Sequence, residues 1–319
     1  MRPVPEVYGS EVWSAGKVRA YRHLAKLDVF DYYLGLLVVW SLLAPADRLG
    51  GTVLGFLVLF LLGEVFVVVA MVALDDLTGY RDGSDATNYG PDAPARKRAR
   101  KPLVAGSLTE TEVLRFAWLT AVVGGLLWTV AVLAAPHRPG WAVAVTAATF
   151  VLALQYSWGV KLSYRGFQEL FLAALGWALV LAPYGLAAGA IGGFVVVQAL
   201  LFGLGPLLFG VYSNTNDVGG DRLVCRPTVA CLVSPRGNAV FIGAVSAAET
   251  ALIVGATLVG VAPWWFPFAM LPTIAMRANQ YHVGFRRSDI LRARKLGMWT
   301  HRLTVVLLVV VNLAQGAAA

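Results

Sequence analysis

Long apolar runs separated by short polar segments make up almost the whole chain. A helix needs about 20 predominantly apolar residues to cross the hydrocarbon layer of a membrane, which is about 30 Å thick. Runs near or above this length lie at 29–46, 52–74, 112–135, 140–158, 167–187, 193–213, 237–260, 263–278 and 300–318. The eighth is short and holds Pro263, Pro267 and Pro272, which predicts a kink or a re-entrant segment. The pattern predicts an all-α, polytopic membrane protein with about nine transmembrane helices.

Composition excludes a soluble domain and changes the interpretation of the charge. Of the 319 residues, 58% are hydrophobic and 14% are charged, whereas soluble domains have about 25% charged residues. The formal charge of +8 lies in the segments between apolar runs, where lipid attraction and topology control account for it. We therefore expect a lipid bilayer as partner and no nucleic acid. Cys225 and Cys231 are too few for a disulfide scaffold and lack metal-ligand spacing.

The positive residues also predict an orientation. Cytoplasmic loops retain lysine and arginine, and almost all of these residues fall in the N-terminal segment and the second, fourth, sixth and eighth loops. Only Arg48 and Arg138 fall on the other side. We therefore expect an odd number of spans, with the N-terminus in the cytoplasm.

The chain divides into two parts. Residues 1–28 form a basic N-terminal segment, in which 10–26 has the pattern of an amphipathic helix on the membrane surface or of a solvated tail. Residues 29–319 form a single transmembrane domain. It is interrupted by two acidic polar segments, expected as loops at 75–111 and 214–237.

The second acidic segment has helical spacing. Asn214, Asp217 and Asp221 are offset by three and seven residues, so they share one face if the preceding helix continues through them. Together with Asn216, they offer the hard oxygen ligands that Mg2+ prefers alongside water and phosphate. An acid-rich turn that merely ends a membrane helix is the competing interpretation.

The first acidic segment runs from Asp75 to Asp85, and its carboxylates repel one another unless cations are present. It follows the second span, while the other acidic segment follows the sixth, so both are expected on the cytoplasmic face. The loop after the fourth span adds Lys161 and Arg165 on the same face. Acids for metal and bases for phosphate, next to an apolar bundle, indicate a site for a membrane-soluble diphosphate.

At this point the chain resembles, over nearly its whole length, the UbiA superfamily of membrane-embedded prenyltransferases. The segment from Asn216 to Arg222, followed by Arg226 and Thr228, is similar to the second aspartate-rich motif of that family. The segment 101–108, with Lys101-Pro102-Leu103, resembles the family's RPLxxG segment.

The menaquinone-pathway branch of the family shares a further segment with this chain, formed by Tyr156, residues 161–166 and Glu169. The first motif departs from the family pattern NDxxDxxxD, because Asp75 replaces the asparagine and Gly79 and Gly83 replace two acids. This departure leaves open which acids of the first segment bind metal.

The resemblance implies nine helices around a central cavity, in the bacterial plasma membrane, with an active site on the cytoplasmic side. It implies Mg2+-dependent transfer of a prenyl group from an allylic isoprenoid diphosphate to an aromatic acceptor. The implied metal ligands are Asp76, Asp82, Asp85, Asn216, Asp217 and Asp221. The implied catalytic residues are Asp76, Asp82, Asp217, Asp221 and Lys161. The implied substrate-binding residues are Lys101, Lys161, Arg165, Arg222, Arg226, Asn214, Tyr156 and Glu64.

Several alternatives remain open from the sequence. A membrane terpene cyclase of the same superfamily would ionise the diphosphate and let the cation react with its own chain. A transporter is a further alternative, because the two acidic segments lie four helices apart and hint at a repeat. Glu64 either lines the cavity or makes a structural hydrogen bond, and for Glu249 we favour the hydrogen bond. Tyr156 is either a site residue or part of an interfacial aromatic belt.

Overall fold

The computed structural model describes residues 10–27, 31–90 and 100–318. These residues form helices joined by turns, with no strand among them. The helices before residue 160 are α1 (Ser10–Ala25), η1 (Asp31–Leu34), α2 (Gly35–Leu42), α3 (Gly51–Arg81), α4 (Ser84–Tyr89), α6 (Glu110–Ala134) and α7 (Gly140–Leu154). The later ones are η2 (Leu162–Arg165), α8 (Gln168–Ala188), α9 (Gly193–Leu223), α10 (Val229–Leu232), α11 (Pro235–Leu258), α12 (Phe266–Ala269), α13 (Leu271–Tyr281), the π-helix η3 (His282–Arg286) and α14 (Ile290–Ala318).

The apolar ranges predicted from the sequence all contain helix. Within the described ranges, six helices are long and apolar enough to cross a membrane, namely α3, α6, α8, α9, α11 and α14. The ranges 29–46 and 140–158 hold shorter apolar helices, and 263–278 is split between α12 and α13. Pro267 and Pro272 each stand in the first turn of one of these two helices, where a missing N–H costs no hydrogen bond. The all-α class is confirmed, while the count of nine spans and the orientation stay predictions.

Helices α3 and α9 run further than their apolar ranges. Helix α3 continues to Arg81, and Gly83 follows with a left-handed φ of 85°. Helix α9 continues to Leu223, shortly before Cys225 with its φ of 53°. Residues 75–81 and 214–223 are therefore helical and not in loops, because no residue there interrupts backbone hydrogen bonding and the change from apolar to polar side chains does not end a helix.

Close helix packing forms the core of the bundle. Helix α3 packs along α6, and α9 packs between α8 and α14. A side chain at Gly176 of α8 would come within 2.8 Å of Gly203 of α9, so glycine at this crossing lets the two backbones touch. The indole N–H of Trp128 on α6 donates to the Phe60 carbonyl of α3 at 3.0 Å.

A buried ion pair joins α11 and α13. The Arg277 guanidinium donates to both Glu249 oxygens, at 2.7 and 2.9 Å, and also to Gln280 Oε1 at 2.6 Å. Glu249 therefore has the structural interhelical role favoured from the sequence. Bidentate geometry is what allows such a pair to remain buried.

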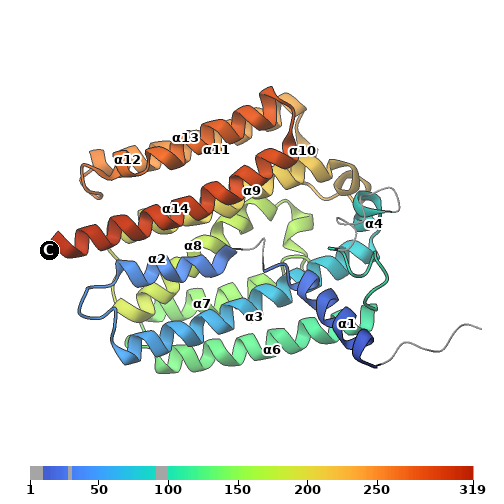
Figure 1. The fold of residues 1–319 in the computed structure, drawn as a ribbon, viewed down its shortest axis with the longest axis horizontal. Helices are drawn as coiled ribbons and strands as arrows, with labels where there is room; N and C mark the ends of the chain where they lie inside the picture. The colour runs from blue at the N-terminus through green and yellow to red at the C-terminus, as the bar shows by residue number, and fades with distance from the viewer. Residues whose placement is uncertain (1–9, 28–30, 91–99, 319) are drawn as a thin grey trace, which may run out of the picture.

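Polar elements gather at one end of the bundle. Figure 1 shows α1, α4 and α10 at this end, where α3 and α9 finish and α14 begins. The amphipathic helix expected in 10–26 is present as α1, whose Leu24 is fully buried in a cluster with Leu74 and Leu77 of α3. Tyr21 packs on Phe116 of α6, with ring centroids 4.9 Å apart.

Candidate active site

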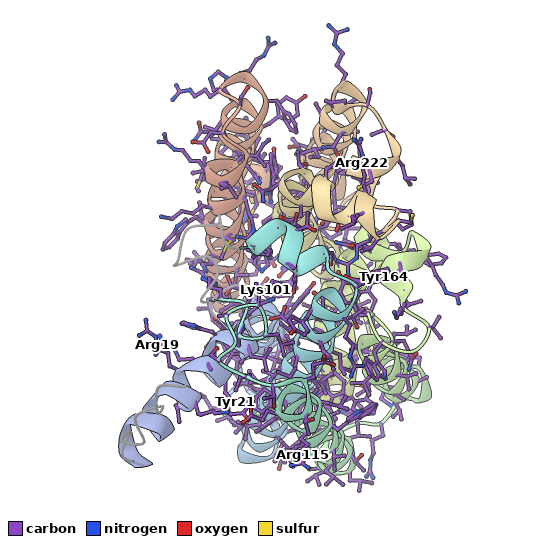
Figure 2. All side chains as sticks on the ribbon, turned by 90° about the vertical axis from the view of Figure 1, so that its right-hand side faces the viewer. Arg19, Tyr21, Lys101, Arg115, Tyr164 and Arg222 are labelled. Carbon is purple, nitrogen blue, oxygen red and sulfur yellow. The ribbon has the colours of Figure 1, made fainter. Side chains whose placement is uncertain are left out.

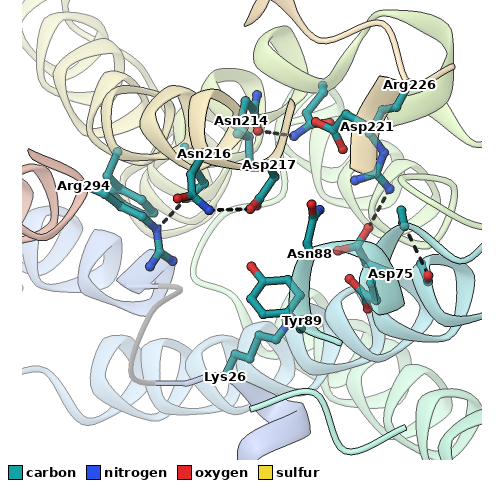
Figure 3. A pocket seen from close by; sticks show the side chains of 18 of the residues that line it. Lys26, Asp75, Asn88, Tyr89, Asn214, Asn216, Asp217, Asp221, Arg226 and Arg294 are labelled. Carbon is teal, nitrogen blue, oxygen red and sulfur yellow. Dashed lines mark hydrogen bonds and ion pairs between the residues drawn. The ribbon is translucent and has the colours of Figure 1, made fainter. Parts of the chain in front are cut away.

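A cavity of about 270 Å3 lies at the polar end, between the ends of α3, α4, α8, α9 and α14. Figure 3 shows that both acidic segments reach it. Asp75 and Asp85 line it from the first segment, and Asp217 and Asp221 line it from the second. Acids separated by four helices in the sequence thus border one space.

Asp75 is held from two directions near the end of α3. Its Oδ1 accepts a hydrogen bond from Ser157 Oγ at 2.6 Å and lies 3.3 Å from Arg226 Nη2. Burial by itself would lower the pKa of Arg226, but the carboxylate of Asp75, together with Tyr156, Tyr164 and Asp221, outweighs burial and raises the pKa. Arg226 is therefore a permanent cation at this wall of the cavity.

Asp76, the next residue of α3, is buried and pairs with two lysines. Its Oδ1 lies 2.8 Å from Lys101 Nζ and also pairs with Lys26, the residue after α1. Its Oδ2 is buried and has no hydrogen-bond partner among the described residues. A buried carboxylate oxygen with no donor is costly, so this atom has spare capacity for a cation.

Asp85 on α4 also pairs with Lys101, and its carboxylate packs against Gly79 of α3. Lys101 Nζ lies 2.7 Å from Asp85 Oδ1, so it joins the carboxylates of Asp76 and Asp85. A Cβ atom at Gly79 would lie 3.0 Å from the Asp85 carboxyl carbon. Gly79, where the family pattern has an acid, therefore makes room for an acid supplied by Asp85.

For Asp85 and for Lys101, burial and the charge of the other residue shift the pKa in opposite directions. Burial raises the pKa of Asp85 to about 6, although the Lys101 ammonium opposes the shift. For Lys101, burial favours the neutral form, but the neighbouring acidic groups, first Asp76 and Asp85 and then Tyr89 and Asp75, together outweigh burial and raise the pKa. The lysine is thus charged over the whole physiological range.

Asn214 is fixed on α9 by a network of hydrogen bonds. Its Nδ2 donates to Glu169 Oε1 at 2.9 Å, and its Oδ1 accepts from Gln168 Nε2 at 2.7 Å. The Val229 N–H at the start of α10 donates to the same Glu169 oxygen at 3.0 Å. Asn214 lines the cavity, but its amide groups hold α8, α9 and α10 together.

The other polar residues of α9 face the cavity with fewer constraints. Asn216 Nδ2 donates to Asp217 Oδ1 at 2.8 Å, and Asp221 is 5% exposed. Helix α4 is held to this part of α9 by Asn88, whose Oδ1 accepts from the Gly220 N–H at 3.1 Å. The spacing of the three polar positions therefore places Asp217 and Asp221 on the cavity side.

Besides the buried Asp76 and Glu64, four residues singled out from the sequence do not line the cavity. Asp82 accepts hydrogen bonds from the Tyr164 hydroxyl and, at 3.0 Å, from the Ser84 N–H, so it stabilises the start of α4. Lys161 is exposed and lies 5.3 Å from the Tyr164 ring centroid. Arg165 is also exposed and donates to the Val160 carbonyl at 2.8 Å.

The fourth of these residues is Arg222. It is exposed, and Figure 2 shows it farther out on the polar end than the centrally placed Lys101. The cavity includes Tyr156, which is 8% exposed and packs on Phe171 with ring centroids 4.8 Å apart. Glu64 is fully buried in α3, does not line the cavity, and has no hydrogen-bond partner for either oxygen among the described residues.

Sequence reasoning missed part of the lining, formed by Lys26, Asp75, Asn88, Tyr89, Arg100, Gln168, Ser213 and Arg294. The sequence did contain a signal for Asp75 as a site residue, because it stands where the family motif has its asparagine. Arg294 had none, because it lies in a basic segment that topology alone explains.

The residues around the cavity fit Mg2+ only if a bound phosphate group and water supply the rest of its coordination shell. Within the described ranges, no group of three His, Cys, Asp or Glu side chains could hold a metal ion. Mg2+ usually takes one or two carboxylates and fills its other positions with water and phosphate. The oxygen ligands around the cavity and the orphaned Asp76 Oδ2 suit an ion held jointly with a phosphate group.

Comparisons with known proteins agree with this geometry. A family model described as the UbiA prenyltransferase family matches residues 34–308. A comparison with curated protein sequences gave no match.

Several solved structures are similar. Digeranylgeranylglyceryl phosphate synthase has a TM-score of 0.62 and 12% identity, covering 93% of this chain and 99% of that one. A UbiA homologue from Archaeoglobus fulgidus, bound to DMAPP and Mg2+, has a TM-score of 0.58 and 12% sequence identity, and the match covers 92% of this chain and 98% of the homologue. The apo UbiA homologue from Aeropyrum pernix K1 has a TM-score of 0.60 and 17% sequence identity, and the match covers 92% of this chain and 97% of the homologue. At these identities the structures establish the fold alone.

Proposed function

The chain belongs to the UbiA prenyltransferase family, and we propose that it transfers a prenyl group from an allylic isoprenoid diphosphate to an aromatic acceptor in an Mg2+-dependent reaction. The site lies in the cavity at the polar end of the bundle, on the cytoplasmic side of the membrane. The observation that carries this proposal is that acids from α3, α4 and α9 border one cavity together with Lys101 and Arg226.

The donor set supports a diphosphate headgroup with bound magnesium. Asp76 and Asp85 would hold Mg2+ from one side, and Asp217 and Asp221 from the other, with the diphosphate oxygens completing the shell. The homologue from Archaeoglobus fulgidus has been solved with DMAPP or GPP together with Mg2+, which supports a ligand of this class here. When bound, Mg2+ supplies charge neutralisation of the diphosphate oxygens.

The basic residues of the cavity would act on the leaving group. The allylic carbon–oxygen bond breaks, the electron pair leaves with the diphosphate, and a nucleophilic atom of the acceptor bonds to the allylic carbon and then loses a proton. Negative charge grows on the diphosphate in this step, so Lys101 and Arg226 stabilise the transition state more than the ground state. Both are largely buried, with side chains 12% exposed, which strengthens their effect.

The apolar side of the cavity would hold the organic part of the substrates. Tyr32, Leu172, Pro206 and Phe209 line it next to Tyr156. These side chains exclude water from an allylic cation, and the aromatic faces stabilise its charge.

A terpene cyclase of the same family is the second candidate, and the first motif favours it. Gly79 and Gly83 stand where the family pattern has acids, so the metal site differs from that of the quinone-pathway enzymes the chain resembles. A cyclase needs the same ionisation step and no acceptor.

One experiment tests the proposal and separates the candidates. The protein, purified in lipid nanodiscs, is incubated with allylic diphosphates of increasing length and Mg2+, with and without phenolic acceptors, and the products are identified by mass spectrometry. A prenylated acceptor is the expected result. A terpene hydrocarbon or alcohol formed without acceptor would favour the cyclase, and no consumption of any diphosphate would contradict both.

A further inference from the structure

Arg294 differs from the other cations of the cavity. It lines the cavity from the first turns of α14, and Figure 3 shows it at the end opposite Arg226, with Asn216 and Asp217 between them. Its Nε donates to Ser213 Oγ of α9, which fixes the guanidinium plane. Lys101 and Arg226 face carboxylates, whereas Arg294 has no ion-pair partner among the described residues.

The position of Arg294 is not explained by helix stability or topology. The helix dipole favours cations only in the last turn of a helix, so it gives no reason for an arginine near the start of α14. Arg292 and Lys295, on either side of it, are exposed and serve as positive residues at the membrane surface, while Arg294 is half-buried. Its two terminal nitrogens present a fork of N–H donors that matches a carboxylate or a phosphate.

We propose that Arg294 and Ser213 form a subsite for the anionic group, carboxylate or phosphate, of the acceptor substrate. This inference rests on the proposed function and deepens it. Phe209, Pro206 and Leu291 line the same cavity and provide an apolar surface for the body of the acceptor. A substrate that reacts with its own chain brings no second anion, so the subsite favours the two-substrate reaction.

Binding of small probes tests the subsite. The full-length protein in nanodiscs is titrated with benzoate, phenyl phosphate and neutral benzamide, both alone and with Mg2+ and geranyl thiolodiphosphate, which does not ionise readily. The variants are Arg294→Gln, Ser213→Ala, which keeps the charge, and Arg292→Gln as a matched control on the same helix.

We expect wild type to bind one of the anions at least about tenfold more tightly than benzamide, and the stronger anion identifies the acceptor group. Arg294→Gln should remove this preference, Ser213→Ala should reduce it, and Arg292→Gln should retain it. Equal binding of all three probes to wild type, or an unchanged preference in Arg294→Gln, would overturn the proposal. So would a loss of thiolodiphosphate affinity in Arg294→Gln, since Arg294 would then bind the diphosphate. Failure of the proposed function would appear separately, as no Mg2+-dependent binding of the thiolodiphosphate to wild type.

Discussion

The guanidinium of Arg226 lies over the ring of Tyr164, with its central carbon 4.3 Å from the ring centroid. The Tyr164 hydroxyl donates to Asp82, the residue that follows α3, while Arg226 pairs with Asp75. Tyr164 therefore links the first acidic segment to the arginine that follows the second one. Asp82, which the resemblance implies as a metal ligand, anchors this link.

Tyr164 is expected to act by positioning Arg226. Tyr164→Leu removes both the ring and the hydroxyl and should lower kcat/KM for the diphosphate by about tenfold, whereas Tyr164→Phe keeps the ring and should cost about threefold or less. Steady-state release of diphosphate checks this. Equal losses in the two variants would show that the ring over Arg226 has no role.

Gly79 should matter because of Asp85. The methyl group of Gly79→Ala would lie about 3.0 Å from the Asp85 carboxyl and would push Asp85 away from Lys101. We expect Mg2+-dependent turnover to fall by about tenfold, although alanine favours a helix over glycine by about 1 kcal/mol. The control is Gly55→Ala on the same helix, where a Cβ would have nothing within 4 Å. Similar activity in both variants would contradict the packing of Asp85 on Gly79.

Asp85 should also make thermal stability depend on pH. Its pKa is raised from 3.8 to about 6 in the folded protein, so the folded state binds the proton more tightly than the unfolded state. The resulting stabilisation is full below about pH 4 and is lost as the pH rises through about 6. Without Mg2+, Tm of wild type relative to Asp85→Asn should fall across this window. A constant difference would show that Asp85 titrates normally.

The ion pair between Glu249 and Arg277 should be needed for stability and not for chemistry. Glu249→Ala leaves a buried guanidinium without its partner, and breaking a buried pair in this way costs about 3–5 kcal/mol. Tm in detergent should fall strongly. The double variant Glu249→Leu, Arg277→Met removes both charges and should recover most of the loss. A double variant as unstable as the single one would mean that the pair is favourable in itself.

The fold was largely predictable because apolar length and proline position have direct structural consequences. The apolar ranges predicted the main helices, and Pro267 and Pro272 predicted the break between α12 and α13. The ends of α3 and α9 were not predictable from hydropathy, since the backbone stays helical after the side chains become polar. The helices end close to Gly83 and Cys225, which have left-handed backbone conformations. A change from apolar to polar residues in the sequence does not reveal these conformations.

The site was predictable only where residues belong to local patterns. The spacing of Asp217 and Asp221 on one helix face indicated their place at the cavity. Asp82 lies beside a motif position without occupying it, and Lys161 lies in the segment shared with the menaquinone-pathway branch, yet the structure directs both to Tyr164. Arg294 reaches the cavity only through the packing of α14 on α9, which a single sequence does not encode locally.

The central claim is that carboxylates from both acidic segments hold one magnesium-bound diphosphate. Its most direct test is the Mg2+-dependent affinity of the purified protein for geranyl thiolodiphosphate, measured for wild type, Asp76→Asn and Asp217→Asn. We expect each variant to bind at least about tenfold more weakly with Mg2+ and to lose most of the Mg2+ dependence. Wild-type affinity and Mg2+ dependence in either variant would mean that only one acidic segment holds the headgroup, and would contradict the claim.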